Sequence, residues 1–163
     1  MKCFNKTLPA FLLSCLFLLI LAQPACARAL LGVSISQGTG QASVQNPDLA
    51  KQIDRAFGDK VAVHSYSSKT TLLSMLLKFN KLDAALVSQK TYDQQPRGSL
   101  IPLATLQTSN ESEQAQMVLA ARANLSSSLR EQLVQGYQEL LLSKNGLELL
   151  EQYAKVVRTR DAL

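Results

Sequence analysis

Cysteine, tryptophan and histidine are scarce in this 163-residue chain, and each scarcity excludes a kind of site. There is no tryptophan, and Cys3, Cys15 and Cys26 all lie near the N-terminus. Without its N-terminal segment the chain would have no disulfide framework, thiolate metal site or cysteine nucleophile. The lack of tryptophan argues against a stacking platform for sugars or single strands. We expect no metal and no cofactor, because transition-metal sites depend on histidine and cysteine, and His64 is the only histidine.

Charge is modest and evenly spread. The chain has 17 Lys and Arg against 12 Asp and Glu, a formal net charge of +5, and no basic run longer than two residues. Such a distribution is typical of a solvated surface and not of a nucleic-acid stripe. We expect no nucleic-acid partner, and at most a preference for anionic over cationic ligands.

The N-terminal segment has the pattern of a secretory signal peptide. Lys2 and Lys6 precede the apolar stretch Leu8–Ala22, and Ala25-Cys26-Ala27 places small residues where a signal peptidase cleaves. We predict a cleaved signal peptide over residues 1–27, and a single secreted domain over residues 28–163.

Three alternatives remain for this segment. Ala27-Arg28-Ala29 is a second possible cleavage site. The apolar stretch is near the lower length limit of a membrane anchor. Cys26 would be the acylated residue of a lipoprotein, although Gln23 stands where the acylation signal usually has a leucine-like residue.

Lys60–Tyr92 is the stretch around which the rest of the chain is organised. An apolar strand, Val61–His64, ends in the polar turn Ser65–Ser68, and a second apolar run, Leu82–Val87, follows a helix. That helix is predicted by apolar residues at i, i+3, i+4 and i+7, namely Leu72, Met75, Leu76 and Phe79. Strand, helix and strand over this length predict one βαβ unit with parallel strands.

A second such unit precedes it. Leu30–Ser36 is the expected first strand, and Gln37–Gln41 is a loop whose Gly-x-Gly pattern we interpret as an ordinary turn. Asn46-Pro47 starts a helix, which Gly58 ends. Its buried face is predicted to be Leu49, Ile53 and Phe57. The alternation predicts an α/β fold, an open three-layer α/β/α sheet of about five mostly parallel strands.

Two further strands follow the polar loop at Tyr92–Ser99. Leu100–Leu106 contains Pro102, which places this strand at an edge or a bulge. Met117–Ala121 is the fifth strand. Too few residues connect these strands for a helical crossover, so they are antiparallel neighbours or lie apart in the sheet.

The C-terminal region is predicted to be helical. Any of Ser126, Ser127 and Ser128 can cap the first helix, and Ser128 with Glu131 fits a capping box. Asn145-Gly146 is expected to break the helix before a second, short one. Val156–Leu163 is expected to fray. The apolar faces are predicted to be Leu129, Leu133, Tyr137, Leu140 and Leu141, then Leu147, Leu150 and Tyr153.

Catalytic chemistry is hard to assemble from these residues. His64 lacks an evident partner, and we interpret it as a structural or surface residue. Asp83 is expected to cap the turn before its strand. A triad of Ser88, His64 and Asp83 lacks the Gly-x-Ser-x-Gly elbow of hydrolases. We therefore do not expect an enzyme.

Hydroxyl side chains follow the predicted parallel strands. Ser36 ends the first strand, Ser67 and Ser68 follow the second, and Ser88 ends the third, with Tyr92 close behind. In open α/β sheets ligands bind at this edge, where helix N-termini also suit an anion. The alternative is that these serines only cap the helices that follow them.

Three passages carry a family resemblance. Tyr66–Tyr92 contains a helix, an Asp-Ala-Ala run between apolar residues, then a serine and a nearby tyrosine. Met117–Leu125 reads MVLAARANL, and Ser128–Leu133 with Asn145–Leu150 forms an interrupted helical end. Together they resemble type 2 periplasmic substrate-binding proteins, most closely the phosphate/phosphonate-binding subgroup of ABC importers. The resemblance implies a periplasmic transport protein for a small anion, with an ABC permease or a sensor as partner.

The resemblance also implies which residues contact the solute: Ser36, Ser67, Ser68, Ser88 and Tyr92. One departure is large: family members close a second lobe over the ligand, whereas this chain passes from the fourth predicted strand directly to the returning strand, without the insertion that forms that lobe. A single lobe buries less of a small solute. The alternative function is a single-lobe interaction module that has lost solute binding and uses the exposed lobe face for a partner or a homodimer.

Overall fold

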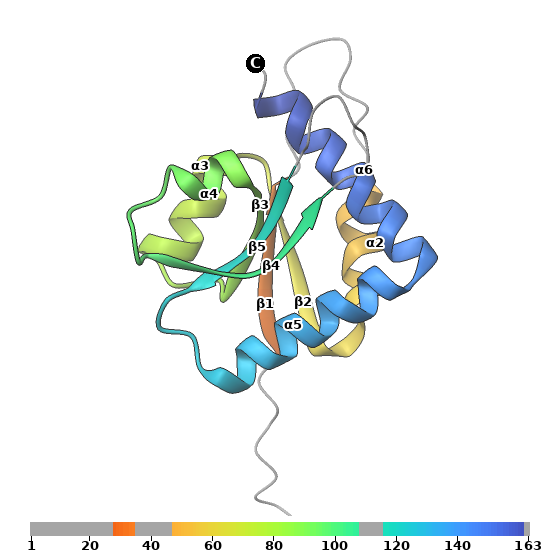
Figure 1. Cartoon of the computed structure of the whole chain (residues 1–163), viewed down its shortest axis with the longest axis horizontal. Coiled ribbons are helices and arrows are strands. Elements are labelled where there is room, and N and C mark those ends of the chain that lie inside the picture. The colour runs from red at the N-terminus through yellow and green to blue at the C-terminus, as the bar shows by residue number, and fades with distance from the viewer. Residues whose placement is uncertain (1–27, 35–46, 108–115, 162–163) are drawn as a thin grey trace, which may run out of the picture.

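A five-stranded mixed sheet, in the order β2-β1-β3-β5-β4, forms the centre of the fold (Figure 1). β1 pairs in parallel with β2 and β3, whereas β5 is antiparallel to both of its neighbours, β3 and β4. Four strands therefore run in one direction, and the prediction of an open, mostly parallel sheet is confirmed. The strands are β1 Ala29–Ser34, β2 Val61–Tyr66, β3 Ala84–Ser88, β4 Leu100–Gln107 and β5 Gln116–Arg122.

The structure is a computed structural model that describes residues 28–34, 47–107 and 116–161. Several predictions fall outside these residues: the signal peptide, Ser36, the loop Gln37–Gln41 and the cap residue Asn46.

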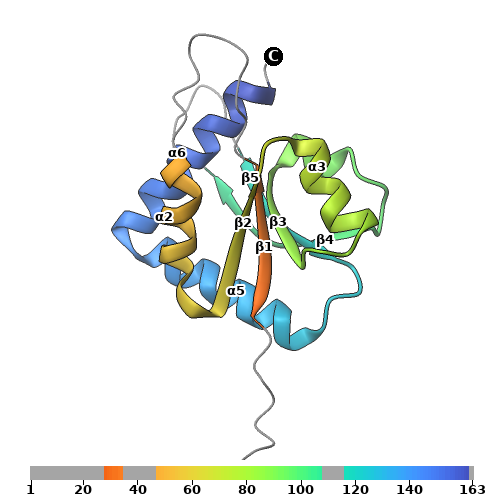
Figure 2. The same cartoon turned by 180° about the vertical axis from the view of Figure 1, so that it is seen from behind.

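Helices cover both faces of the sheet. α2, α5 and α6 lie on one face, and α3, its continuation η2 and α4 lie on the other (Figures 1 and 2). This is the three-layer α/β/α arrangement that the sequence predicted. The helices are α2 Pro47–Phe57, η1 Gly58–Lys60, α3 Lys69–Leu73, η2 Ser74–Lys78, α4 Gln89–Asp93, α5 Ser127–Leu142 and α6 Lys144–Asp161.

The central strands are buried on both faces, which explains why they are continuous apolar runs in the sequence. Successive side chains of a strand point to opposite faces. In β3, Ala84 and Leu86 accordingly join the core under α2, α5 and α6, while Ala85 and Val87 join the core under α3 and α4. The predicted apolar face of α2 is confirmed, since Leu49, Ile53 and Phe57 are all buried.

β4 and β5 are antiparallel neighbours, which is one of the two arrangements that the sequence allowed. β4 is an edge strand, and its register with β5 shifts between Pro102 and Ala104. Both consequences expected of Pro102 are therefore present. A proline cannot donate a ladder hydrogen bond, so a bulge at an edge is where it costs least.

The expectation that Phe79 lies on the buried face of its helix is wrong. α3 passes into the π-helical turn η2, in which the Phe79 amide donates to the Ser74 carbonyl at 3.0 Å. A π turn adds a residue and rotates the residues after it away from the i, i+3, i+4 face. Phe79 is 52% exposed, and Asn80 ends the turn with a φ of 52°.

Of the three serines expected to be able to cap α5, Ser126 is the cap, and its Oγ accepts a hydrogen bond from the Leu129 amide. The capping box of Ser128 with Glu131 therefore does not form, and the break between the C-terminal helices also differs from expectation. The break falls at Ser143, whose backbone is extended. α6 then continues to Asp161, so the region is neither a short helix nor a frayed tail over that range.

Asn145-Gly146 lies inside the first turn of α6 instead of breaking the helix. A Cβ at position 146 would collide with the backbone carbonyl oxygen of Leu140. A glycine is therefore needed at position 146 because α5 and α6 approach closely at their corner, and it does not mark a break in the helix.

Candidate functional site

The carboxyl ends of β1, β2 and β3 meet at one edge of the sheet, because these three strands are parallel neighbours. The chain passes from β1 to β2 on one side of it, and then returns to β3 on the other side. α2 and α3, the helices of these two connections, lie on opposite faces of the sheet (Figure 1). The end of β1 is therefore a topological switch point, the place where open α/β sheets bind ligands.

On the β2 side of this switch point lie Ser67 and Ser68. Ser67 is exposed. Ser68 caps α3: its Oγ accepts from the Thr71 amide at 3.1 Å and lies 2.8 Å from the Thr71 hydroxyl. The cap interpretation is thus correct for Ser68, and a ligand role for its hydroxyl stays a prediction.

On the β3 side lie Ser88 and Tyr92, both half-buried. Ser88 caps α4, with its Oγ accepting from the Thr91 amide at 3.3 Å and donating to the Thr91 hydroxyl at 2.9 Å. The structure therefore brings four of the five predicted ligand residues to one edge, on both sides of β1. The fifth, Ser36, lies outside the described residues.

Tyr153, on α6, is a residue of this edge that sequence analysis assigned only to an apolar face. Its hydroxyl accepts from the Ser34 amide at 2.9 Å and donates to the Leu86 carbonyl at 3.0 Å. Ser34 ends β1, and the β1–β3 pairing stops at Val33 and Leu86. The hydroxyl thus bridges two backbone groups at the end of this ladder. An apolar helix position in the sequence indicates burial but not a polar partner, so no signal could have identified this bridge.

At the amino ends of β1 and β3, opposite the Tyr153 bridge, Asp83 links the two strands. Its carboxylate accepts from the Leu30 amide at 2.9 Å and from Arg122 Nη2 at 2.8 Å. The Asp83 and Arg122 side chains are only 13% and 19% exposed. Asp83 precedes β3 and Ser88 ends it, so the strand separates them by roughly 16 Å at about 3.3 Å per residue. With His64 exposed on β2, the structure does not assemble the triad.

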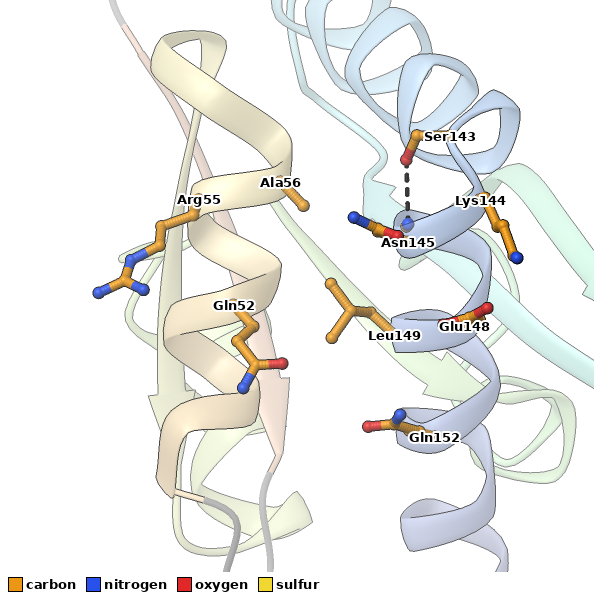
Figure 3. Close-up of a pocket in the computed structure, with 10 residues that line it drawn as sticks. Gln52, Arg55, Ala56, Ser143, Lys144, Asn145, Glu148, Leu149 and Gln152 are labelled. Carbon is orange, nitrogen blue, oxygen red and sulfur yellow. Dashed lines mark hydrogen bonds between the residues drawn. The ribbon is translucent and has the colours of Figure 1, made fainter.

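A groove lies between α2 and α6 (Figure 3). It lies away from the edge that carries Ser67, Ser68 and Ser88, which we call the hydroxyl edge. It has a volume of about 740 Å³ and is lined mainly by polar side chains. Figure 3 shows Leu149 and Gln152 directed toward α2, while Arg55 points away from α6. The groove contains none of the residues that the sequence singled out for ligand binding.

Burial raises the pKa of two tyrosines. It raises the pKa of the half-buried Tyr66, which ends β2, above its usual value. It raises the pKa of Tyr137, in α5, to about 12. The Tyr137 hydroxyl has no hydrogen-bond partner among the described residues.

Within residues 28–34, 47–107 and 116–161, no three histidine, cysteine or carboxylate side chains lie close enough together to hold a metal ion. Over the same ranges, none of the helices combines the length and apolarity needed to span a bilayer.

Comparison with known proteins leaves the family open. No family model matches the chain, and neither a curated protein nor a solved structure matches it. What is established is an α/β/α fold with a hydroxyl-lined edge at its switch point.

Proposed function

We propose that this chain is a secreted, non-catalytic, single-lobe solute-binding protein. It binds a small oxyanion of the phosphate or phosphonate type and serves an ABC importer or a sensor. One observation carries the proposal: Ser67, Ser68 and Ser88 lie on both sides of the switch point, at the ends of β2 and β3. Hydroxyl and backbone N–H donors at such an edge suit an oxyanion.

Two features support the anionic character of the ligand. Lys69 directly follows the capping residue Ser68 and starts α3, and Lys90 is the second residue of α4, two positions after Ser88. They add positive charge beside the hydroxyls, while Asp93 lies at the far end of α4. These two cations favour the approach of an oxyanion to this edge.

The sheet order agrees with the resemblance found in the sequence. β5 contains the passage that resembles the returning strand of type 2 periplasmic binding proteins, and it is the one antiparallel strand of the sheet. Because β4 runs parallel to β3, it ends at the hydroxyl edge, where β5 also begins. This is the edge at which the resemblance would place a second lobe.

The test is a thermal-shift titration of the chain from Arg28 onward with phosphate, methylphosphonate, phosphite and sulfate. An anion at a hundred times its dissociation constant should add about 2.7 kcal/mol of stability. We expect a concentration-dependent rise in melting temperature with at least one of them. No shift at millimolar concentrations of any of them would refute oxyanion binding.

Ser68→Asp and Ser88→Asp separate ligand contact from helix capping. Aspartate caps a helix about as well as serine, so both variants should fold, but its charge repels an anion. We expect them to lose the anion-dependent shift. Ser126→Asp is the matched control, because Ser126 caps α5 away from this edge and should leave the shift intact. Wild-type anion shifts in both edge variants would mean that these serines are caps only.

The two edge strands restrict how the alternative, a protein-interaction module, could bind a partner. The bulge at Pro102 disrupts the ladder of the edge strand β4. On the other edge strand, the Val63 amide of β2 donates to the Asp54 carboxylate at 2.8 Å. Both devices discourage a further strand from pairing with the sheet. This alternative therefore uses the lobe face at the hydroxyl edge, where the resemblance would place a second lobe, and not strand pairing alongside the sheet.

A further inference from the structure

Phe79 lies at the amino ends of the parallel strands, opposite the hydroxyl edge at their carboxyl ends. It follows η2, and it is 52% exposed, with the Lys78 ammonium 5.6 Å from the centre of its ring. Lys78, Phe79, Asn80 and Lys81 are all exposed and precede β3, so this loop projects at the amino end of the parallel strands. We call residues 78–81 the Phe79 loop. An aromatic ring among cations is the combination that interfacial membrane contacts use.

Two other basic residues lie at the same edge as this loop. Arg122 Nη1 donates to the Asn80 side-chain oxygen at 3.4 Å, and the Ala123 amide donates to the Ser99 carbonyl at 3.4 Å. Exposed Arg97 lies two residues before Ser99, which brings it to the same edge.

The charge of this edge is only partly compensated. Arg122 is paired with Asp83, Lys60 with Glu139, and Arg28 with Asp54, so these cations are neutralised locally. In contrast, no carboxylate of the described residues forms an ion pair with Lys78, Lys81 or Arg97. Exposed Asp59 and Glu131 are the remaining acids near the amino ends of β2 and α5. Around Phe79 itself the excess charge is therefore positive.

The described part of the chain begins at this same edge. Arg28 immediately precedes β1, at the amino end of the parallel strands, and the apolar stretch Leu8–Ala22 lies shortly before it in the sequence. Along the chain, this edge is therefore the one nearest to the stretch that would engage a membrane.

We propose that the Phe79 loop is a peripheral contact for an anionic lipid surface. Phe79 inserts at the level of the headgroups, and Lys78, Lys81 and Arg97 lie against lipid phosphates. The contact is independent of the proposed solute binding. It also leaves the hydroxyl edge directed away from the membrane, because the two edges lie at opposite ends of the same strands.

The test is flotation of the chain from Arg28 onward, which contains every described strand and helix, with vesicles. Vesicles of phosphatidylcholine with about a third phosphatidylglycerol are compared with phosphatidylcholine alone. We expect binding only to the anionic vesicles, weakening as salt rises from about 20 to about 500 mM, because the Debye length shortens. No binding at low salt, or equal binding to neutral vesicles, would overturn the proposal.

Variants locate the contact. Lys78→Gln and Lys81→Gln should each lower vesicle affinity about fivefold, from about 1 kcal/mol per basic residue near an anionic surface. Phe79→Ser should lower it further at high salt, where only the apolar part of the contact remains.

Matched controls change exposed apolar and basic residues elsewhere. Leu142 is 87% exposed on α5, and Lys51 and Lys144 are exposed on α2 and α6. Leu142→Ser, Lys51→Gln and Lys144→Gln should leave binding within twofold of wild type. Equal losses in the control and loop variants would overturn the proposal, since diffuse charge would then explain the binding. Circular dichroism verifies that all variants fold.

Discussion

Removing one hydroxyl oxygen should have opposite consequences at two buried tyrosines. Tyr153 and Tyr137 have no exposed surface, and both pack in the core under α2, α5 and α6. The Tyr153 hydroxyl joins the Ser34 amide to the Leu86 carbonyl, whereas the Tyr137 hydroxyl has no partner among the described residues. A tyrosine-to-phenylalanine change at each position therefore removes the same atom from a satisfied and an unsatisfied environment.

The magnitudes depend on hydrogen bonding. Tyr153→Phe removes two hydrogen bonds and leaves a buried N–H and a buried C=O unpaired, at about 1 to 3 kcal/mol for each stranded group. Relaxation of β1 toward β3 would recover part of this loss, so we expect a net cost of about 2 kcal/mol. Tyr137→Phe should be neutral, or stabilise by up to about 1 kcal/mol, because it removes a desolvated hydroxyl that gains nothing in return.

Urea denaturation of the two variants measures this difference directly. With an unchanged m-value, the midpoint should fall for Tyr153→Phe and stay level or rise for Tyr137→Phe. The melting temperature of Tyr153→Phe should drop by about 8 °C, at about 4 °C per kcal/mol for a domain of this size. Equal stability losses in the two variants would refute the reasoning, because ring packing and not the bridge would then set the cost.

Three further outcomes are expected. Asp83→Ala should cost about 3 kcal/mol in urea denaturation, because it leaves a largely buried Arg122 without its carboxylate; a cost below about 0.5 kcal/mol would mean that the ion pair is solvated. Gly32→Ala should lower the melting temperature steeply, since the new Cβ would collide with the Leu72 side chain, and a variant as stable as wild type would contradict that packing. Tyr137, with its pKa raised to about 12, keeps its proton longer in the folded than in the unfolded state, so stability should be full below about pH 10 and fall as pH rises toward 12; Tyr137→Phe should remove that part of an alkaline denaturation profile.

Much of the fold could be predicted from the sequence because local patterns and tertiary packing agree in most elements. The spacing of Leu49, Ile53 and Phe57 predicted a buried helix face, and Pro102 predicted both an edge and a bulge. The prediction for Phe79 was wrong because it assumed about 3.6 residues per turn, and a π turn contains more residues than that. Nothing local distinguishes a helix that will contain such a turn.

The candidate site was predictable only in its location. Parallel strands place Ser67, Ser68 and Ser88 at one edge, and that inference requires only that the strands are parallel. The Tyr153 bridge was not predictable, because it joins α6 to β1 and β3 across a large sequence separation. A helical period assigns a residue to a face, but it does not say which backbone groups that face will meet.

The place of β5 between β3 and β4 determines when this chain is able to fold during synthesis. Among the described residues β4 pairs with β5 alone, so it has no neighbour until residues 116–122 have left the ribosome. β3 lacks one of its two neighbours until the same moment, and the Tyr153 bridge closes later still. A nascent chain lacking its last third therefore exposes unpaired strand edges and cannot complete a core. If the chain is secreted as proposed, this delay is useful, because a translocase must thread the polypeptide before a finished domain blocks its passage.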